Sequence, residues 1–267
     1  MNDMSGRDET FEAVPAVIRR RKRPDTVADQ IRERIVETGL SPGDRLPHDW
    51  IEPETWHVSR GTLREALKVL ESQGLTTSKT GPGGGVFVSS VEAQQAIRLL
   101  DNLFLHRPPS IGDIYAIRKE LEPLLAAGLA GKLTGSALSL LQDKIRLYED
   151  EPATAQEEYR QRMAELDFHE ELARHCENRL LGFLCRFLVS LLRDMAVCRE
   201  IYQQHNPALR ETGLHYQVAL LRAIKAGNAE RASAIMRDHM IAAETYMLER
   251  AEIRRRRLSD PDPAQRR

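Results

Sequence analysis

Apolar residues recur along the chain at spacings that predict a short mixed region followed by a long helical one. From Val27 to Ile35 they return every three to four residues, which indicates the buried face of a helix that Gly39 ends. A turn follows at 41–44. A weaker helical segment is expected over 49–56, where Pro53 fits only the first turn of a helix.

A second amphipathic segment and a glycine-rich hairpin complete the mixed region. Ser59 is placed to cap a helix that Gly74 ends. Two β-prone segments, 75–78 and 86–88, flank the run GPGGG, and this arrangement predicts a hairpin. Three helical segments and a hairpin in this order outline a winged helix-turn-helix domain, which we place at 25–90.

The rest of the chain reads as helices, and no strand is expected there. Proline, glycine or asparagine marks most of the breaks, so an all-helical bundle is predicted over 91–252. The fold class is therefore mostly α. Residues 1–24 and 253–267 are polar and charged without periodicity, which predicts disorder. The expected helices span 91–106, 111–131, 135–149, 153–176, 179–203, 207–226 and 228–252.

Composition excludes several classes of protein. The 267 residues carry 39 Lys+Arg against 40 Asp+Glu, and their length suggests two domains. Because no apolar run of about 18 residues is present, we expect no membrane-spanning helix. Because the start is polar and has no apolar stretch, we expect no secretory signal. Three cysteines without CxxC spacing argue against a disulfide scaffold or a zinc finger, and they favour a cytoplasmic protein.

The near-zero net charge hides two basic ends around an acidic body. Residues 1–23 hold 6 basic and 4 acidic side chains, and five of the basic ones are consecutive at 19–23. Residues 251–267 hold 6 basic and 3 acidic side chains, whereas 24–90 hold 7 and 10. A basic arm before a folded domain commonly holds phosphates, although a solvated tail has the same composition.

The helix expected after Ser59 presents side chains suited to reading DNA. Arg60, Thr62 and Arg64 lie near its start on the face opposite the apolar residues. A recognition helix reads the major groove with its N-terminal residues, and arginine pairs with O6 and N7 of guanine. Lys79, at the base of the hairpin, would add a phosphate contact. The alternative is that both arginines form surface ion pairs with neighbouring acids.

Three segments of this region resemble the DNA-binding domain of GntR-type bacterial transcription regulators. They are SPGDRLP (41–47), VSRGTLREALKVLESQGL (58–75) and GPGGGVFV (81–88). The resemblance implies that Arg60 and Arg64 contact operator bases and that the hairpin tip enters the minor groove. The residues expected to bind DNA are Ser59, Arg60, Thr62, Arg64, Lys79, Gly81 and Arg45.

One segment departs from the GntR pattern. The family usually has an E-R-x-L-A type second helix, whereas this chain has HDWIEPETWH at 48–57. Trp50 stands where an arginine that contacts DNA is frequent in the family. We therefore expect the basic arm at 19–23, rather than this segment, to supply the additional phosphate contacts.

The helical region resembles the FCD domain of the FadR subfamily. The matching segments are IGDIYAIRKELEPLLAAGLA (111–130), ELDFHEELARHCENRLL (165–181) and VALLRAIKAGNAERASAIMRDHM (218–240). The resemblance covers most of 93–245. It implies a small-metabolite effector, often a carboxylate, and in many members a divalent metal held by one carboxylate and three histidines.

Three residues are the expected metal ligands. Glu165 and His169 lie four residues apart and project from one helix face, and His239 comes from a separate helix. Carboxylate and imidazole suit Zn²⁺, Ni²⁺ or Mn²⁺. In this chain Glu165 stands at the position of the family's aspartate, and Gln217 at that of its second histidine. The substitutes considered for the missing ligand are His215 and Asp167.

The expected effector residues are Arg118 and Gln217. Arg118 lies in a helix that is otherwise apolar on one face, and the resemblance implies that it faces the pocket and pairs with an anion. The alternative is a surface pair with Glu122. Without a metal, His169, Gln217 and His239 would hydrogen-bond the ligand directly.

The expected function is a ligand-responsive transcription regulator, with repression as the commoner outcome in the family. A homodimer would place two recognition helices on a pseudo-palindromic operator in double-stranded DNA. A metal-free acyl-CoA sensor of the same subfamily and a metal-dependent enzyme are the alternatives. The sequence has no HExxH motif, nucleophile elbow or phosphate-binding glycine loop to favour the enzyme.

Deletion of residues 1–23 tests the basic arm. We expect the truncated chain to bind DNA more weakly at all sequences, with a shallower dependence of affinity on salt, because fewer counterions are released. Gel shifts between about 50 and 200 mM salt measure both effects. An unchanged salt slope would identify the arm as a solvated tail.

Overall fold

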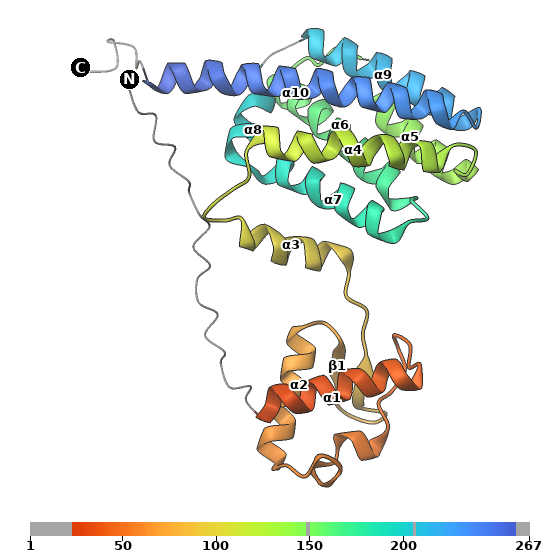
Figure 1. The fold of residues 1–267 in the computed structure, drawn as a ribbon, viewed down its shortest axis with the longest axis vertical. Coiled ribbons are helices and arrows are strands. Elements are labelled where there is room, and N and C mark those ends of the chain that lie inside the picture. The colour runs from red at the N-terminus through yellow and green to blue at the C-terminus, as the bar shows by residue number, and fades with distance from the viewer. Residues whose placement is uncertain (1–22, 148–149, 205–206, 260–267) are drawn as a thin grey trace, which may run out of the picture. The chain divides into compact units, whose positions relative to one another are not determined.

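The computed structural model describes residues 23–147, 150–204 and 207–259. Figure 1 shows the fold, whose two compact units are divided between Glu92 and Ala93. The mostly α fold class predicted from the sequence is confirmed. The predicted disordered arm lies outside the described residues apart from Arg23 and Pro24, which begin the first helix. Within the described ranges, no helix is both long and apolar enough to cross a membrane.

The first unit is a winged helix-turn-helix. Ile31 in α1 and Leu63 and Leu70 in α2 are buried in its core, as their spacing predicts. The two strands pair antiparallel from Thr76 opposite Val88 to Lys79 opposite Gly85. The elements are α1 (Arg23–Thr38), the single-turn 3-10 helices η1 (His48–Ile51) and η2 (Pro53–Trp56), α2 (Arg60–Ser72), β1 (Thr76–Lys79) and β2 (Gly85–Val88).

The segment between α1 and α2 is not the helix that the sequence predicts over 49–56. Glu52 is extended between η1 and η2, since a residue that precedes proline is disfavoured in the helical region. Trp50 is buried in the core of the unit rather than placed on its surface. The indole N–H of Trp56 donates to the carbonyl of Trp50 at 2.8 Å, and the Arg34 guanidinium lies 4.6 Å from the centroid of the Trp56 ring. Trp50 therefore stabilises the unit from within.

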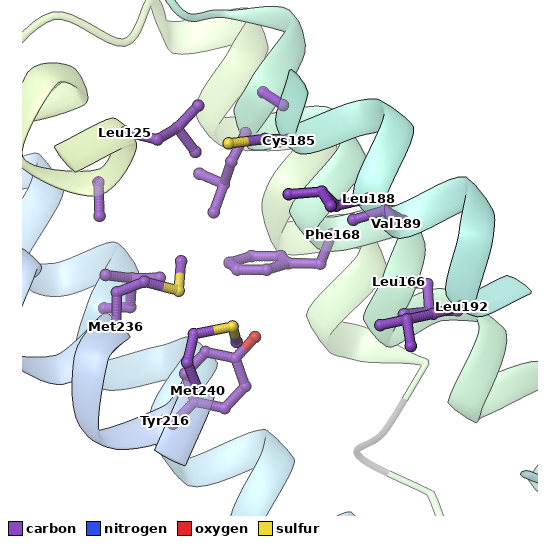
Figure 2. Close-up of a cluster of buried hydrophobic side chains, with 14 of the residues drawn as sticks. Leu125, Leu166, Phe168, Cys185, Leu188, Val189, Leu192, Tyr216, Met236 and Met240 are labelled. Carbon is purple, nitrogen blue, oxygen red and sulfur yellow. The ribbon is translucent and has the colours of Figure 1, made fainter. Parts of the chain in front are cut away.

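The second unit is a helical bundle. Figure 1 shows its longest helix, α10, running beside α4. Figure 2 shows the core, where Phe168 from α6 lies between the leucines of α7 and two methionines of α10, Met236 and Met240. The elements are α3 (Ala93–Leu103), α4 (Ile111–Leu129), α5 (Gly135–Arg146), α6 (Ala155–Arg174), α7 (Arg179–Asp194), α8 (Ala196–Tyr202), α9 (Pro207–Lys225) and α10 (Ala229–Ser259).

Two predicted helices differ from the observed ones. The helix expected over 179–203 is divided at Met195, which is extended and packs against the core, so tertiary contacts override the local helical pattern. The helix expected to end at 252 continues to Ser259, which corrects the prediction of a disordered tail for its first seven residues. Arg254 pairs with Glu200 of α8 and helps to hold this extension.

Candidate functional site

The start of α2 carries four of the residues expected to bind DNA. The backbone N–H of Thr62 donates to Ser59 Oγ at 3.1 Å, so Ser59 caps the helix as predicted. Arg60 and Arg64 are exposed one turn apart. The acid beside them, Glu65, pairs instead with Lys68, and neither arginine is in an ion pair within the described part of the chain. Both guanidinium groups are therefore available to a partner.

The hairpin carries two of the other three, Lys79 and Gly81, and Arg45 lies in the loop that bridges to Phe87 of β2. Gly81 has φ +90° and nothing lies within 4 Å of the place of a side chain there, so the tip is open. The ammonium of Lys79 lies 4.8 Å from the centroid of the Phe87 ring. A Cβ on Gly85 would stand 2.6 Å from Arg45 Nε, so glycine at this position lets the Arg45 side chain lie against the hairpin.

A buried chain of charged and polar groups crosses the bundle. The Nε of Arg118 donates to Glu122 Oε1, and the Nδ1 of His169 lies 2.5 Å from Glu122 Oε2. The Tyr216 hydroxyl lies 2.7 Å from Nε2 of the same histidine. The side chains of Arg118 and Glu122 are 2% and 1% exposed, so the alternative of a surface pair is wrong. Both sit on the inner face of α4, where a lone charge would be strongly destabilising.

The positions of the hydrogens on these buried groups follow from their partners. Burial alone would raise the pKa of the Glu122 carboxyl, but the charges of Arg118 and His169 and their hydrogen bonds lower it to about 2. A carboxylate only accepts hydrogen bonds, so Nδ1 of His169 carries the hydrogen and donates. With the hydrogen on Nδ1, Nε2 is the ring nitrogen left to accept from the Tyr216 hydroxyl.

Glu165, His169 and His239 lie together, as the sequence predicts. One ligand atom of each is within 4.8 Å of the others, and Nε2 of His239 is 3.4 Å from Glu165 Oε1. Burial lowers the pKa of His239 to about 4 despite the opposing hydrogen bond and charge of Glu165, so its imidazole is neutral at neutral pH. Neutral imidazole and carboxylate are the donors that zinc, nickel and manganese accept.

A divalent metal therefore fits this donor set. Glu122 adds a further feature of such sites, because ligating histidines usually donate their second ring N–H to a carboxylate. That bond fixes the ring of His169 with Nε2 directed away from Glu122.

The two substitutes considered for the missing ligand are not brought to this group. Asp167 lies 2.6 Å from a guanidinium nitrogen of Arg193, because it is two residues from Glu165 and faces another side of α6. His215 is exposed. Gln217 is fully buried, and neither of its amide atoms has a hydrogen-bond partner among the described residues. Gln217 also does not line the cavities described next.

Two cavities lie beside the metal group, which consists of Glu165, His169 and His239. The inner one measures about 20 Å³, and the outer groove between α9 and α10 measures about 530 Å³. His239 lines both, and Tyr216 lines the outer groove while it bonds His169. Arg118 Nη2 is buried without a hydrogen-bond partner among the described residues. The inner cavity is lined by Tyr115, Arg118, Glu165, Leu166, His169, Tyr202, His239, Ala243, Tyr246 and Met247.

Sequence reasoning missed two members of the site. Glu122 entered only as a surface partner of Arg118, although its spacing four residues away indicated the pair. Tyr216 carried no signal, because its role depends on the rotation of α9 about its axis. Along that helix His215 is exposed, Tyr216 is 7% exposed and Gln217 is 0% exposed.

Two family models match the chain. Residues 24–88 match the one described as bacterial regulatory proteins, gntR family, and residues 113–242 match the FCD domain. The first model covers the winged helix-turn-helix with its exposed arginines. The second covers the helices that hold the buried charge chain and the metal group.

Similar proteins are transcription regulators. The HTH-type transcriptional regulator LutR of Bacillus subtilis (strain 168) is 30% identical over 209 residues, which are 78% of this chain and 93% of that protein. The putative L-lactate dehydrogenase operon regulatory protein of Escherichia coli (strain K12) is 28% identical over 234 residues, 85% of this chain and 87% of that protein. The solved structure of Streptococcus agalactiae GntR, 22% identical with a TM-score of 0.55, covers 83% of this chain and 99% of that one and shares its fold.

Glu122→Gln tests the buried charge chain. We expect a loss of about 3–5 kcal/mol in the free energy of unfolding of the helical unit, because Arg118 would stay buried without a counter-charge. Urea denaturation followed by circular dichroism measures it. The matched control is Glu177→Gln in the same unit, whose side chain is 72% exposed and lies 2.7 Å from Lys132, and which should change the same free energy by less than about 1 kcal/mol. Equal losses in both variants would contradict the assignment.

Proposed function

Because the chain belongs to the GntR family of bacterial transcription regulators and carries its FCD domain, we propose that it is a repressor controlled by a small carboxylate. The family and the similar proteins are regulators, not enzymes. The chain is thus a transcription regulator of the GntR/FCD type. The observation that carries the proposal is that one chain has two exposed arginines at the start of α2 and, in its helical unit, a buried Arg118 beside the cluster of Glu165, His169 and His239.

DNA is read by the start of α2 and held by the hairpin. Arg60 and Arg64 are exposed and without acidic partners, which leaves their guanidinium groups for guanine edges. Ser59 and Thr62 lie at the helix start, where hydroxyl groups reach phosphates. Since residues 24–90 carry more acidic than basic side chains, binding depends on these few placed residues, on Lys79 and on the basic run at 19–23 rather than on bulk charge.

The effector binds in the bundle. Glu165, His169 and His239 would hold a divalent metal, which when bound would supply a Lewis acid for carboxylate oxygens. Arg118 supplies the countercharge through its unpartnered Nη2. The name of one relative refers to an L-lactate dehydrogenase operon, so a short hydroxycarboxylate is the first effector to test.

Dimerisation uses the exposed side of α4 and α10. Apolar side chains recur there at seven-residue spacing on each helix, and the Glu120–Arg237 pair at 3.6 Å joins the two stripes on one face. A second copy of the chain would cover this face and place two recognition helices on one operator. The exposed residues, between 43% and 59% accessible, are Ile117, Leu124, Ile241 and Leu248.

Arg64→Ala tests the DNA-reading role. We expect operator binding to weaken by about 1–3 kcal/mol and preference at one base position to relax. Gel shifts with the DNA upstream of the gene measure both. The control is Arg146→Ala in the helical unit, which removes the same charge from an exposed pair with Asp143 and should leave binding unchanged. The absence of any sequence-specific shift by the wild-type protein would refute the regulator itself.

Glu165→Gln tests the metal and effector role. We expect bound metal to fall at least about tenfold, because the amide is a poor ligand for a transition ion, and the response of operator binding to L-lactate to fall with it. Elemental analysis of protein purified without chelators measures the first, and gel shifts with added L-lactate measure the second. Asp167→Asn, two residues along α6 and paired with Arg193, is the matched control. Equal metal content in both variants would refute this site.

A further inference from the structure

The metal group is closed toward the outer groove by one side chain. Tyr216 is 7% exposed and lines the groove, its ring stacks on His239 with centroids 3.3 Å apart, and its hydroxyl bonds His169. Figure 2 shows Tyr216 beside Met240 in the core. The inner cavity of about 20 Å³ has room for about one water or a bare ion. A larger ligand therefore needs space that the groove supplies.

The Tyr216 hydroxyl and a metal ion compete for the same lone pair. Glu122 fixes the hydrogen of His169 on Nδ1, so Nε2 is the nitrogen left to bind a metal. The Tyr216 hydroxyl lies 2.7 Å from that nitrogen. A single lone pair does not accept a hydrogen bond and coordinate an ion at once. Occupation of the site thus requires this hydrogen bond to break.

The spacing of the donors is close to that of a metal site. The ligand atoms of Glu165, His169 and His239 lie within 4.8 Å of one another. Around a tetrahedral ion with bonds of about 2.0–2.1 Å, two donors lie about 3.4 Å apart. Glu165 Oε1 and Nε2 of His239 already have this spacing, at 3.4 Å. To complete the site, Nε2 of His169 must be freed from Tyr216, which is stacked on one histidine and bonded to the other.

We propose that Tyr216 is the gate residue of the metal site, displaced from His169 by the arriving ion and turned into the groove between α9 and α10. The proposal rests on the metal site of the proposed function. Metal binding then moves a side chain of α9, so the occupancy of the site is linked to the conformation of this helix.

Tyr216→Phe removes the competing hydroxyl and keeps the ring. We expect the full-length variant to bind Zn²⁺ about 3- to 30-fold more tightly than the wild type, because no hydrogen bond has to break and Nε2 of His169 lacks a donor before the ion arrives. Competition with a chromophoric chelator measures the affinity. Tyr159→Phe on α6, which lines neither cavity, is the matched control and should bind as the wild type does.

A second measurement follows the displacement itself. Zn²⁺ should produce a tyrosine difference spectrum in the wild type and in Tyr159→Phe, and that signal should be absent from Tyr216→Phe. Equal or weaker Zn²⁺ binding by Tyr216→Phe, or an unchanged difference spectrum, would overturn the gate and leave the metal site intact. Failure of every variant to bind Zn²⁺ would overturn the metal site together with the gate, while the gel shifts of the Arg64→Ala experiment test DNA binding separately.

Discussion

The ion pair between Arg118 and Glu122 is the constraint on which the bundle's site depends. Both charges are buried within one turn of α4, so neither is tolerated without the other. Glu122 also accepts from His169, which fixes the hydrogen of that ring on Nδ1 and turns Nε2 toward the cavity. The same carboxylate thus positions the ring of His169, a proposed metal ligand, and pairs with the arginine beside the cavity. The hydrogen bond of Tyr216 to His169 is a consequence of this arrangement.

The DNA-reading unit follows a different principle. Its net charge is acidic, and its affinity for a polyanion has to come from a few exposed groups held in place by a packed core. Trp50 and Trp56 form part of that support, with Arg34 stacked on their rings. The departure of this segment from the family pattern therefore changes how the recognition helix is supported, while the exposed arginines of α2 are kept.

Much of the fold was predictable because its signals are local. Capping by Ser59, the stop at Gly74 and the hairpin each depend on neighbouring residues, and the structure has them where the sequence places them. The break at Met195 and the continuation of α10 to Ser259 were not predictable, because both depend on contacts with distant helices. Local helical propensity is weaker than such packing.

The sequence by itself determined the order of the elements, the arginines on α2 and the shared helix face of Glu165 and His169. The family resemblance indicated His239 as their neighbour, and the three side chains lie together in the structure. Only the tertiary structure decided that Tyr216, rather than Gln217 or His215, faces the metal group. Successive residues on a helix differ by about 100° in direction, and the rotation of α9 is set by packing against other helices. A rotation of α9 by one residue would therefore bring Gln217 or His215, instead of Tyr216, to face His169.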